Sequence, residues 1–258
     1  MPHEFNGEKY TKASAHQKEW GARLIAEFEL RGDEQILDLG CGDGTLTAKM
    51  ADLVPDGRVL GIDASRGMIE AAGKHNRPNL TFVLMDINDM RFEAEFDLVF
   101  SNATLHWVKD HHRLLANVFE ALTDNGMLRF NFGADGNCLH FFKVIREAMA
   151  QKEYARYFNG FDWPWTMPRV DEYAALLKQF PFRRARAWGE NADRNFPDAE
   201  ALVGWIDQPS IVPFLKCVDE SDKQRFRDTV VEAMVAQTIQ NDGTYFETFR
   251  RINVLAVK

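Results

Sequence analysis

The chain has 258 residues, of which 45% are hydrophobic and 27% are charged, and these proportions are ordinary for a globular protein. Its formal net charge of -8 at pH 7 argues against non-specific binding to nucleic acid, because such binding needs an excess of Lys and Arg to displace counterions. Two basic clusters, at 183–186 and at Arg250 and Arg251, are too small to reverse this balance and are expected to be solvated strand ends.

The cysteines and the N-terminal segment indicate the compartment. Cys41, Cys138 and Cys217 are scattered and odd in number, so we expect no disulfide framework, which fits a reducing environment. The first residues show no basic region followed by an apolar stretch, and no apolar run approaches the roughly 18 residues of a membrane span. We therefore expect a cytoplasmic protein, a monomer or weak homodimer, that binds neither membrane nor nucleic acid.

The first half of the chain alternates helical and strand-like segments. A helical pattern covers 9–30, and it precedes strands expected at 35–39, 59–62, 80–84, 96–100 and 127–132 and helices expected at 46–53, 65–74 and 111–122. Strands that alternate with helices at this spacing predict βαβ units and a parallel sheet with right-handed crossovers. Ligands of such a sheet bind at the carboxyl ends of the strands, where the strand order reverses.

The second half is less regular. Helices are expected at 139–149, 170–180, 198–206 and 221–239, strands at 183–188 and 251–257, and an aromatic loop at 154–167. The sequence thus predicts an α/β fold, a doubly wound, mostly parallel sheet of seven strands, with a helical insertion or cap.

The strongest motif lies at 36–45, Ile-Leu-Asp-Leu-Gly-Cys-Gly-Asp-Gly-Thr, where a strand ends in a glycine-rich turn that opens a helix. Glycines let the backbone pass close to a ligand, and the helix N-terminus offers free N–H groups. The spacing is Gly-x-Gly-x-Gly, whereas the dinucleotide fingerprint is Gly-x-Gly-x-x-Gly, and Thr45 stands where its third glycine is needed.

Two further acids end successive strands. Asp63 closes the second strand about 20 residues past the glycine turn, where a carboxylate can accept both hydroxyls of a ribose. Asp86 follows the third strand and can accept an exocyclic amine of adenine while Ile87 packs on the ring. A solvated turn is the alternative for a lone loop Asp, but three acids ending three successive strands favour a nucleoside site.

Residues 35–132 resemble the class I S-adenosylmethionine-dependent methyltransferases. The run 38–44 is similar to the family's first motif, Asp63 to its ribose-binding acid, Asp86 to its adenine-side acid and 122–128 to the turn before its fifth strand. The segment 96–108, with Asn-Ala-Thr-Leu-His-Trp after the strand, resembles the trans-aconitate methyltransferase group, as do the chain length and the closing 249–254. Residues 133–137 depart from that group's Pro-Asp-Asn stretch.

The resemblance implies one methyltransferase domain over 1–258, with S-adenosyl-L-methionine as cofactor. Residues 1–30 are then a cap helix, 31–132 the cofactor-binding core, and 133–181 and 195–243 helical insertions on the acceptor side. The expected cofactor-binding residues are Asp38, Gly40, Cys41, Gly42, Gly44, Asp63, Ala64, Met68, Asp86, Ile87, Asn102 and Ala103, with Tyr10, Gln17 and Trp20 from the cap helix. Core packing is the alternative for Trp20.

The expected acceptor is a small, anionic molecule, and O-methylation of a carboxylic acid fits the lack of an acid–base pair, since a carboxylate is ionised at pH 7. The candidate acceptor-binding residues are His106, Trp107, Trp163, Trp165 and Arg169. The alternative for Arg169 is that it is a surface arginine. The alternative for the aromatic loop is that it is only a rigid hydrophobic loop. The histidines at 106–112 lack the pattern of a zinc site, so no metal is expected. Methylation of another O, N or C acceptor, a nicotinamide oxidoreductase and a non-catalytic cofactor-binding module remain as alternatives.

Overall fold

The computed structural model describes the backbone of residues 15–258 and the side chains of 18–208 and 210–258. The described chain divides into two compact units. The first contains the described residues up to Asp135 together with Trp165–Glu190 and Arg251–Lys258, and the second contains Gly136–Pro164 and Asn191–Arg250.

The first unit carries a large sheet and the helices that cover it. Its elements are α2 (Ala15–Ile25), β1 (Gln35–Leu39), α3 (Thr45–Leu53), β2 (Arg58–Asp63), α4 (Arg66–Ala72), η1 (Gly73–His75), β3 (Leu80–Leu84), η2 (Ile87–Asp89), β4 (Phe96–Asn102), η3 (Leu105–Trp107), α5 (His111–Ala121), β5 (Leu122–Gly133), α7 (Val170–Leu177), β6 (Arg184–Asn191) and β9 (Arg250–Val257).

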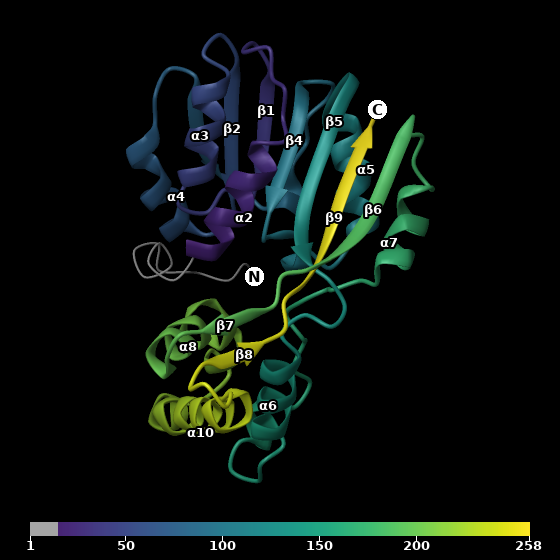
Figure 1. Ribbon diagram of the computed structural model, residues 1–258. Coiled ribbons are helices and arrows are strands. Elements are labelled where there is room, and N and C mark those ends of the chain that lie inside the picture. The colour runs from purple at the N-terminus through teal and green to yellow at the C-terminus, as the bar shows by residue number, and fades with distance from the viewer. Residues whose placement is uncertain (1–14) are drawn as a thin grey trace. The chain divides into compact units, whose positions relative to one another are not determined.

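The described strands form a seven-stranded sheet in the order β3-β2-β1-β4-β5-β9-β6, as Figure 1 shows. The pairs that join β3, β2, β1, β4 and β5 are parallel, and β9 runs antiparallel to β5. The predicted doubly wound, mostly parallel sheet is therefore confirmed. The strand order reverses between β1 and β4, so the carboxyl ends of these strands form the expected ligand crevice.

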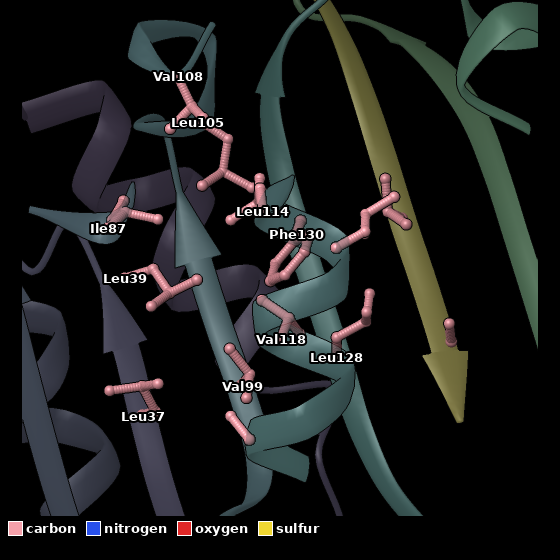
Figure 2. Close-up of a cluster of buried hydrophobic side chains, with 14 of the residues drawn as sticks. Leu37, Leu39, Ile87, Val99, Leu105, Val108, Leu114, Val118, Leu128 and Phe130 are labelled. Carbon is pink, nitrogen blue, oxygen red and sulfur yellow. The ribbon is translucent and has the colours of Figure 1, made fainter. Parts of the chain in front are cut away.

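Both faces of the sheet are covered by apolar side chains because successive residues of a buried strand point to opposite faces. On one face the strand residues Leu37, Val99 and Phe130 belong to the same core cluster as Leu114 and Val118 of α5, and Figure 2 shows part of this cluster. On the opposite face the core joins the sheet to α2 and α3. Its buried members there are Leu24, Ile25, Ile36, Met50, Ala51, Val54, Val59, Leu80, Leu98 and Phe100.

The second unit is mostly helical. Its elements are α6 (Leu139–Met149), η4 (Ala155–Phe158), β7 (Arg194–Phe196), α8 (Ala199–Trp205), η5 (Ile206–Ser210), α9 (Val212–Leu215), α10 (Glu220–Thr238) and β8 (Tyr245–Glu247). Edge-to-face ring contacts fill its interior, such as those that Phe141 makes with Trp205 and Phe214.

The structure differs from the sequence-based expectations in several elements. The pair β7–β8 was not predicted, since strands of three residues carry almost no alternation. Leu122 already pairs with Phe96 as the first residue of β5, although we expected it to end a helix. Residues 165–181 were expected in a helical insertion, yet α7 lies in the first unit because Tyr173 and Leu177 join the core of the large sheet. No helix within residues 15–258 is long and apolar enough to cross a membrane.

Candidate active site

The glycine turn after β1 has two different faces. Gly40, Gly42 and Gly44 all have positive φ angles (+73°, +55° and +77°), a conformation that glycine adopts without a steric penalty. A Cβ atom built on Gly40 would lie 2.1 Å from Cγ2 of Thr104, whereas one built on Gly42 would meet nothing within 4 Å. Gly40 thus packs against the loop after β4, while Gly42 borders open space that a ligand can approach closely.

Asp63, at the end of β2, is joined directly to this turn. Its Oδ2 accepts a hydrogen bond of 3.0 Å from the Gly42 N–H, and its Oδ1 accepts one of 2.8 Å from the Ser65 N–H. The second-strand acid and the glycine turn, 21 residues apart, therefore form one local structure. Its half-buried carboxylate lies where the sequence placed a ribose-binding acid.

Asp38 lies beneath the turn and is only 3% exposed. The Thr47 hydroxyl donates to its Oδ2 at 2.7 Å. Burial raises the pKa of Asp38 to about 7, the Thr47 hydrogen bond lowers it, and the nearby charge of Asp63 raises it. Burial likewise raises the pKa of the Cys41 thiol, which favours its protonated, neutral form.

The remaining candidates for cofactor binding follow the ends of β2 and β3. Ser65 caps α4 by accepting from Met68 N at 3.4 Å, and the Met68 side chain is buried. Ala64 is half-buried between Asp63 and Ser65. Asp86 accepts from the backbone and the side chain of Asn88 at 2.9 and 2.8 Å. Ile87, which follows it, is 7% exposed and belongs to the core.

Helix α2 is tied to the glycine turn by an ion pair. Lys18 Nζ lies 2.6 Å from Oδ2 of Asp43, a turn residue with a 4% exposed carboxylate. Trp20, two residues further along the helix, stacks under the guanidinium of Arg251 with 4.6 Å from Cζ to the ring centroid. Gln17 belongs to α2, and Tyr10 lies outside the described residues.

The loop after β4 places the acceptor candidates at the same edge of the sheet. Asn102 pairs with Asn131 of β5, and Ala103 (φ 58°) donates from its N–H to the Asn131 carbonyl at 2.7 Å. The chain then forms η3, which holds His106 and Trp107.

The end of the aromatic loop packs on η3. Thr166 N donates to the His106 carbonyl at 2.8 Å, and the Trp107 and Trp165 rings lie 5.3 Å apart. Three of the five predicted acceptor residues, His106, Trp107 and Trp165, are therefore neighbours.

The His106 ring is held in its neutral form. Burial lowers its pKa to about 3, and electrostatic interactions with Arg251 and His111 act in the same direction. Its Nδ1 is buried and has no hydrogen-bond partner within the described part of the chain. A buried nitrogen of this kind is costly unless a ligand or water satisfies it, so the ring is suited to hydrogen-bond a bound molecule.

Two acceptor candidates lie elsewhere. Trp163 belongs to the second unit, where its ring contacts Phe142 and lies under the guanidinium of Arg146. Arg169 lies at the start of α7 with a 60% exposed side chain and makes two 3.0 Å hydrogen bonds to Asp171. It thus has the surface position that the sequence left open as an alternative.

A buried polar cluster on β5 and β9 was not predicted. It consists of Arg129, Asn131, Arg251 and Asn253, each at most 5% exposed. Arg251 was expected to be a solvated strand end, and this expectation was wrong because the alternation along β9 turns its side chain into the molecule. The polar residues at every second position of 128–132 and 251–254 were the signal that could have revealed the cluster.

Comparison with known proteins agrees with this geometry. A family model described as a methyltransferase domain matches residues 36–126. The protein named trans-aconitate 2-methyltransferase from Deinococcus radiodurans is 32% identical over 232 residues, which cover 87% of this chain and 86% of that protein. The protein of the same name from Methylobacterium radiotolerans is 29% identical, and the match covers 99% of this chain and 98% of that protein.

Solved structures share the fold. The YcgJ protein from Bacillus subtilis superimposes with a TM-score of 0.62 at 16% identity, covering 94% of this chain and 98% of that one. The phosphoethanolamine N-methyltransferase 2 of Haemonchus contortus, solved with S-adenosyl-L-methionine, also gives 0.62 at 16% identity, covering 98% of this chain and 56% of that one. The chain belongs to the class I S-adenosylmethionine-dependent methyltransferases and is similar over its length to the trans-aconitate methyltransferase group.

Proposed function

We propose that this small-molecule methyltransferase transfers a methyl group to a carboxylate oxygen of a small organic acid of the trans-aconitate type. The observation that carries the proposal is the acceptor edge, where the His106 Nδ1 is buried without a hydrogen-bond partner among the described residues, and where burial, followed by the positive charge of Arg251, lowers the pKa of His106 to about 3. A neutral ring nitrogen can hydrogen-bond an acceptor, and a carboxylate acceptor needs no base because it is already ionised at pH 7. The names of the relatives from D. radiodurans and M. radiotolerans support the same acceptor class.

The residues at the ends of β1, β2 and β3 fit S-adenosyl-L-methionine. The open space in front of Gly42 admits a close backbone approach, and we assign Asp63, which accepts from the Gly42 N–H, to the ribose hydroxyls. Asp86 and Ile87 are assigned to the adenine, and Asn102 and Ala103 to the side of the cofactor that faces β4. Bound S-adenosyl-L-methionine supplies a methyl group activated by a positively charged sulfur.

The protein's own contribution to the reaction is positioning. An acceptor oxygen must lie in line with the methyl carbon and the sulfur, so that the C–O bond forms as the C–S bond breaks and its electron pair remains on sulfur. Fixing this geometry can supply roughly 7–11 kcal/mol of the barrier. We assign it to His106, Trp107 and Trp165, whose rings contact one another after β4.

The test is a methylation screen with S-adenosylmethionine labelled in its methyl group. The panel contains small mono-, di- and tricarboxylic acids, with amines and phenols of matched size. We expect label in acids only, and we expect alkali to release it as volatile methanol, because esters hydrolyse in base whereas methylamines and methyl ethers do not. Transfer only to amines or phenols would overturn the carboxylate assignment. The control is Gly42→Val, a variant that we expect not to bind the cofactor.

A further inference from the structure

The segment that carries His106 and Trp107 is a short 3-10 helix, η3. Helices of this type have poorer hydrogen-bond geometry than α-helices, so the position of η3 must come largely from the groups around it. Two of these groups belong to the segment that leads into α7. Thr166 N donates to the His106 carbonyl at 2.8 Å, and the Trp165 ring lies 5.3 Å from that of Trp107.

His111, the first residue of α5, adds a buried contact to this arrangement. Its Nδ1 forms a hydrogen bond of 3.1 Å with the hydroxyl of Tyr173 on α7, and both residues are buried. The imidazole also stacks on Phe132 of β5, with 5.4 Å between the ring centroids and 28° between the ring planes. The His111 ring is therefore fixed by a strand and a helix that lie far from it in the sequence.

The same ring acts on both ends of η3. Burial lowers the pKa of His111 to about 4, whereas the backbone of Leu105 and that of Val108 raise it. Leu105 is the first residue of η3 and Val108 follows its last residue, so the imidazole lies against the backbone at both ends of this helix. Leu105, Val108 and Tyr173 also belong to one core cluster, in which Figure 2 labels the first two.

The hydrogen bond between His111 and Tyr173 joins two neutral groups at pH 7. Burial lowers the pKa of the imidazole and raises the pKa of the phenol, so neither side chain is charged there. A neutral pair can be buried without a counter-ion, because each group satisfies the hydrogen-bonding need of the other. It can thus fix the geometry of η3 without placing a charge beside the acceptor.

We propose that His111 and Tyr173 are positioning residues of the acceptor site. Their hydrogen bond joins α7 to η3 and so holds His106 and Trp107 in place. The inference rests on the acceptor edge proposed above, but not on which atom of the acceptor receives the methyl group. A misplacement of about 1 Å in the groups that orient a substrate can lower activity about a hundredfold, so such support matters although it does not touch the acceptor.

Tyr173→Phe tests the proposal, because it removes one hydroxyl and keeps the ring. The variant is assayed with the best acceptor of the methylation screen, whichever atom of that acceptor is methylated. We expect the KM for the acceptor to rise at least fivefold, while the affinity for S-adenosylhomocysteine, measured by calorimetry, stays within twofold of wild type. A merely structural role would reduce the number of folded molecules, which lowers the rate without changing the KM.

Val118→Ala is the matched control for a loss of stability. Val118 belongs to the same core cluster and lies on α5 about 10 Å from His111, as labelled in Figure 2. The variant leaves a cavity and should lower the melting temperature at least as much as Tyr173→Phe does, yet keep the acceptor KM within twofold of wild type. An equal rise of the KM in both variants would overturn the inference, because any loss of core packing would then have this effect.

Substitutions of His111 test the other partner of the hydrogen bond. His111→Asn keeps a polar atom at about the place of Nδ1, so it can still bind the Tyr173 hydroxyl, whereas His111→Leu cannot. We expect His111→Leu to raise the acceptor KM at least fivefold and His111→Asn to raise it threefold or less. The double variant of His111→Leu and Tyr173→Phe should have a KM within twofold of the single variants, since one hydrogen bond is lost only once. Increases that multiply would show two independent effects and would overturn the inference.

The failure of this inference can be told from the failure of the proposed function. An unchanged acceptor KM in Tyr173→Phe overturns the role of the hydrogen bond, and an impaired His106→Ala would then show that the acceptor edge itself is placed correctly. Transfer only to amines or phenols leaves the test intact, because the screen chooses the acceptor. If Tyr173→Phe does not fold, the comparison of His111→Leu with His111→Asn decides, and equal KM values in these two variants overturn the inference.

Discussion

Thr47 donates a 2.7 Å hydrogen bond to Asp38 beneath the glycine turn, and the burial of this carboxyl gives the protein a pH-dependent stability. Burial raises the pKa of Asp38 from its ordinary 3.8 to about 7, so the folded protein binds a proton there that the unfolded chain has already lost. The stabilisation is complete below pH 3.8 and is lost as the pH rises through about 7.

We therefore expect Asp38→Asn, which stays neutral, to become more stable relative to wild type as the pH rises. The difference in the free energy of unfolding should grow by about 1.4 kcal/mol per pH unit up to pH 7 and then level off. Urea unfolding without cofactor between pH 5 and pH 8.5 measures it. Thr47→Val removes the hydrogen bond that lowers the pKa of Asp38, so in this background the stability difference should level off at a higher pH. A stability difference between Asp38→Asn and wild type that does not change with pH would show that Asp38 ionises normally.

Gly40 and Gly42 should respond differently to the same substitution. Gly40→Ala brings a Cβ to 2.1 Å from Thr104 Cγ2 and should lower the melting temperature, because the loop after β4 must move. Gly42→Ala meets nothing within 4 Å, so it should lose cofactor affinity at least tenfold while remaining folded, at the cost of about 1–2 kcal/mol for a positive φ. Differential scanning fluorimetry with and without S-adenosylhomocysteine distinguishes a loss of stability from a loss of cofactor binding. Tight binding of S-adenosylhomocysteine by Gly42→Ala would contradict the assignment of the cofactor to this turn.

Asp63→Ala should weaken the binding of S-adenosyl-L-methionine by about 1.5–3 kcal/mol, roughly tenfold to hundredfold, as expected for losing hydrogen bonds to a charged group. Calorimetry measures the affinity, and Asp56→Ala, in the exposed turn before β2, is the control that should bind normally. Unchanged affinity in a folded Asp63→Ala protein would contradict the ribose assignment.

The sequence predicted the cofactor half of the fold because its signals are local. The glycine spacing at 40–44 and an acid at the end of each of three successive strands specify a turn and a crevice without knowledge of distant contacts. The large sheet followed from the regular alternation of strands and helices, and the predicted doubly wound, mostly parallel arrangement was confirmed.

The second unit and the acceptor edge depend on contacts between residues far apart in sequence. Glu247, fully buried, accepts from the His140 and Phe141 N–H groups at 3.2 and 2.9 Å and so takes the place of a capping residue at the start of α6, more than 100 residues away. Arg250 and Arg251 are identical neighbours in the sequence, yet Arg250 pairs with Asp193 and Arg251 is buried against Asn131. Only the strand register decides which of the two turns inward.

Substitution of His106 or Trp107 should impair the use of the acceptor and leave the affinity for the cofactor unchanged. The sequence placed them after the fourth strand, where the methyl group should project, and η3 holds them there through Trp165 and the backbone of Thr166. We expect His106→Ala and Trp107→Ala to raise the acceptor KM or lower kcat by at least tenfold, while cofactor affinity stays within threefold. Steady-state kinetics with the best acid of the screen, together with calorimetry, provide both numbers.

The pH profile then tests how His106 acts. Because burial and the charge of Arg251 lower its pKa to about 3, the ring remains neutral from pH 5 to pH 9 and binds as a hydrogen-bonding group, so kcat/KM should show no inflection near pH 6.5. His106→Asn, which keeps a neutral donor and acceptor, should recover part of the activity lost in His106→Ala. His112→Ala is the matched control, since His112 is exposed on α5 and packs only on Phe180 among the described rings. An inflection near pH 6.5 that disappears in His106→Asn would mean that the ring titrates in the working enzyme. If His106→Ala and Trp107→Ala both methylate the acceptor with wild-type efficiency, the acceptor binds elsewhere.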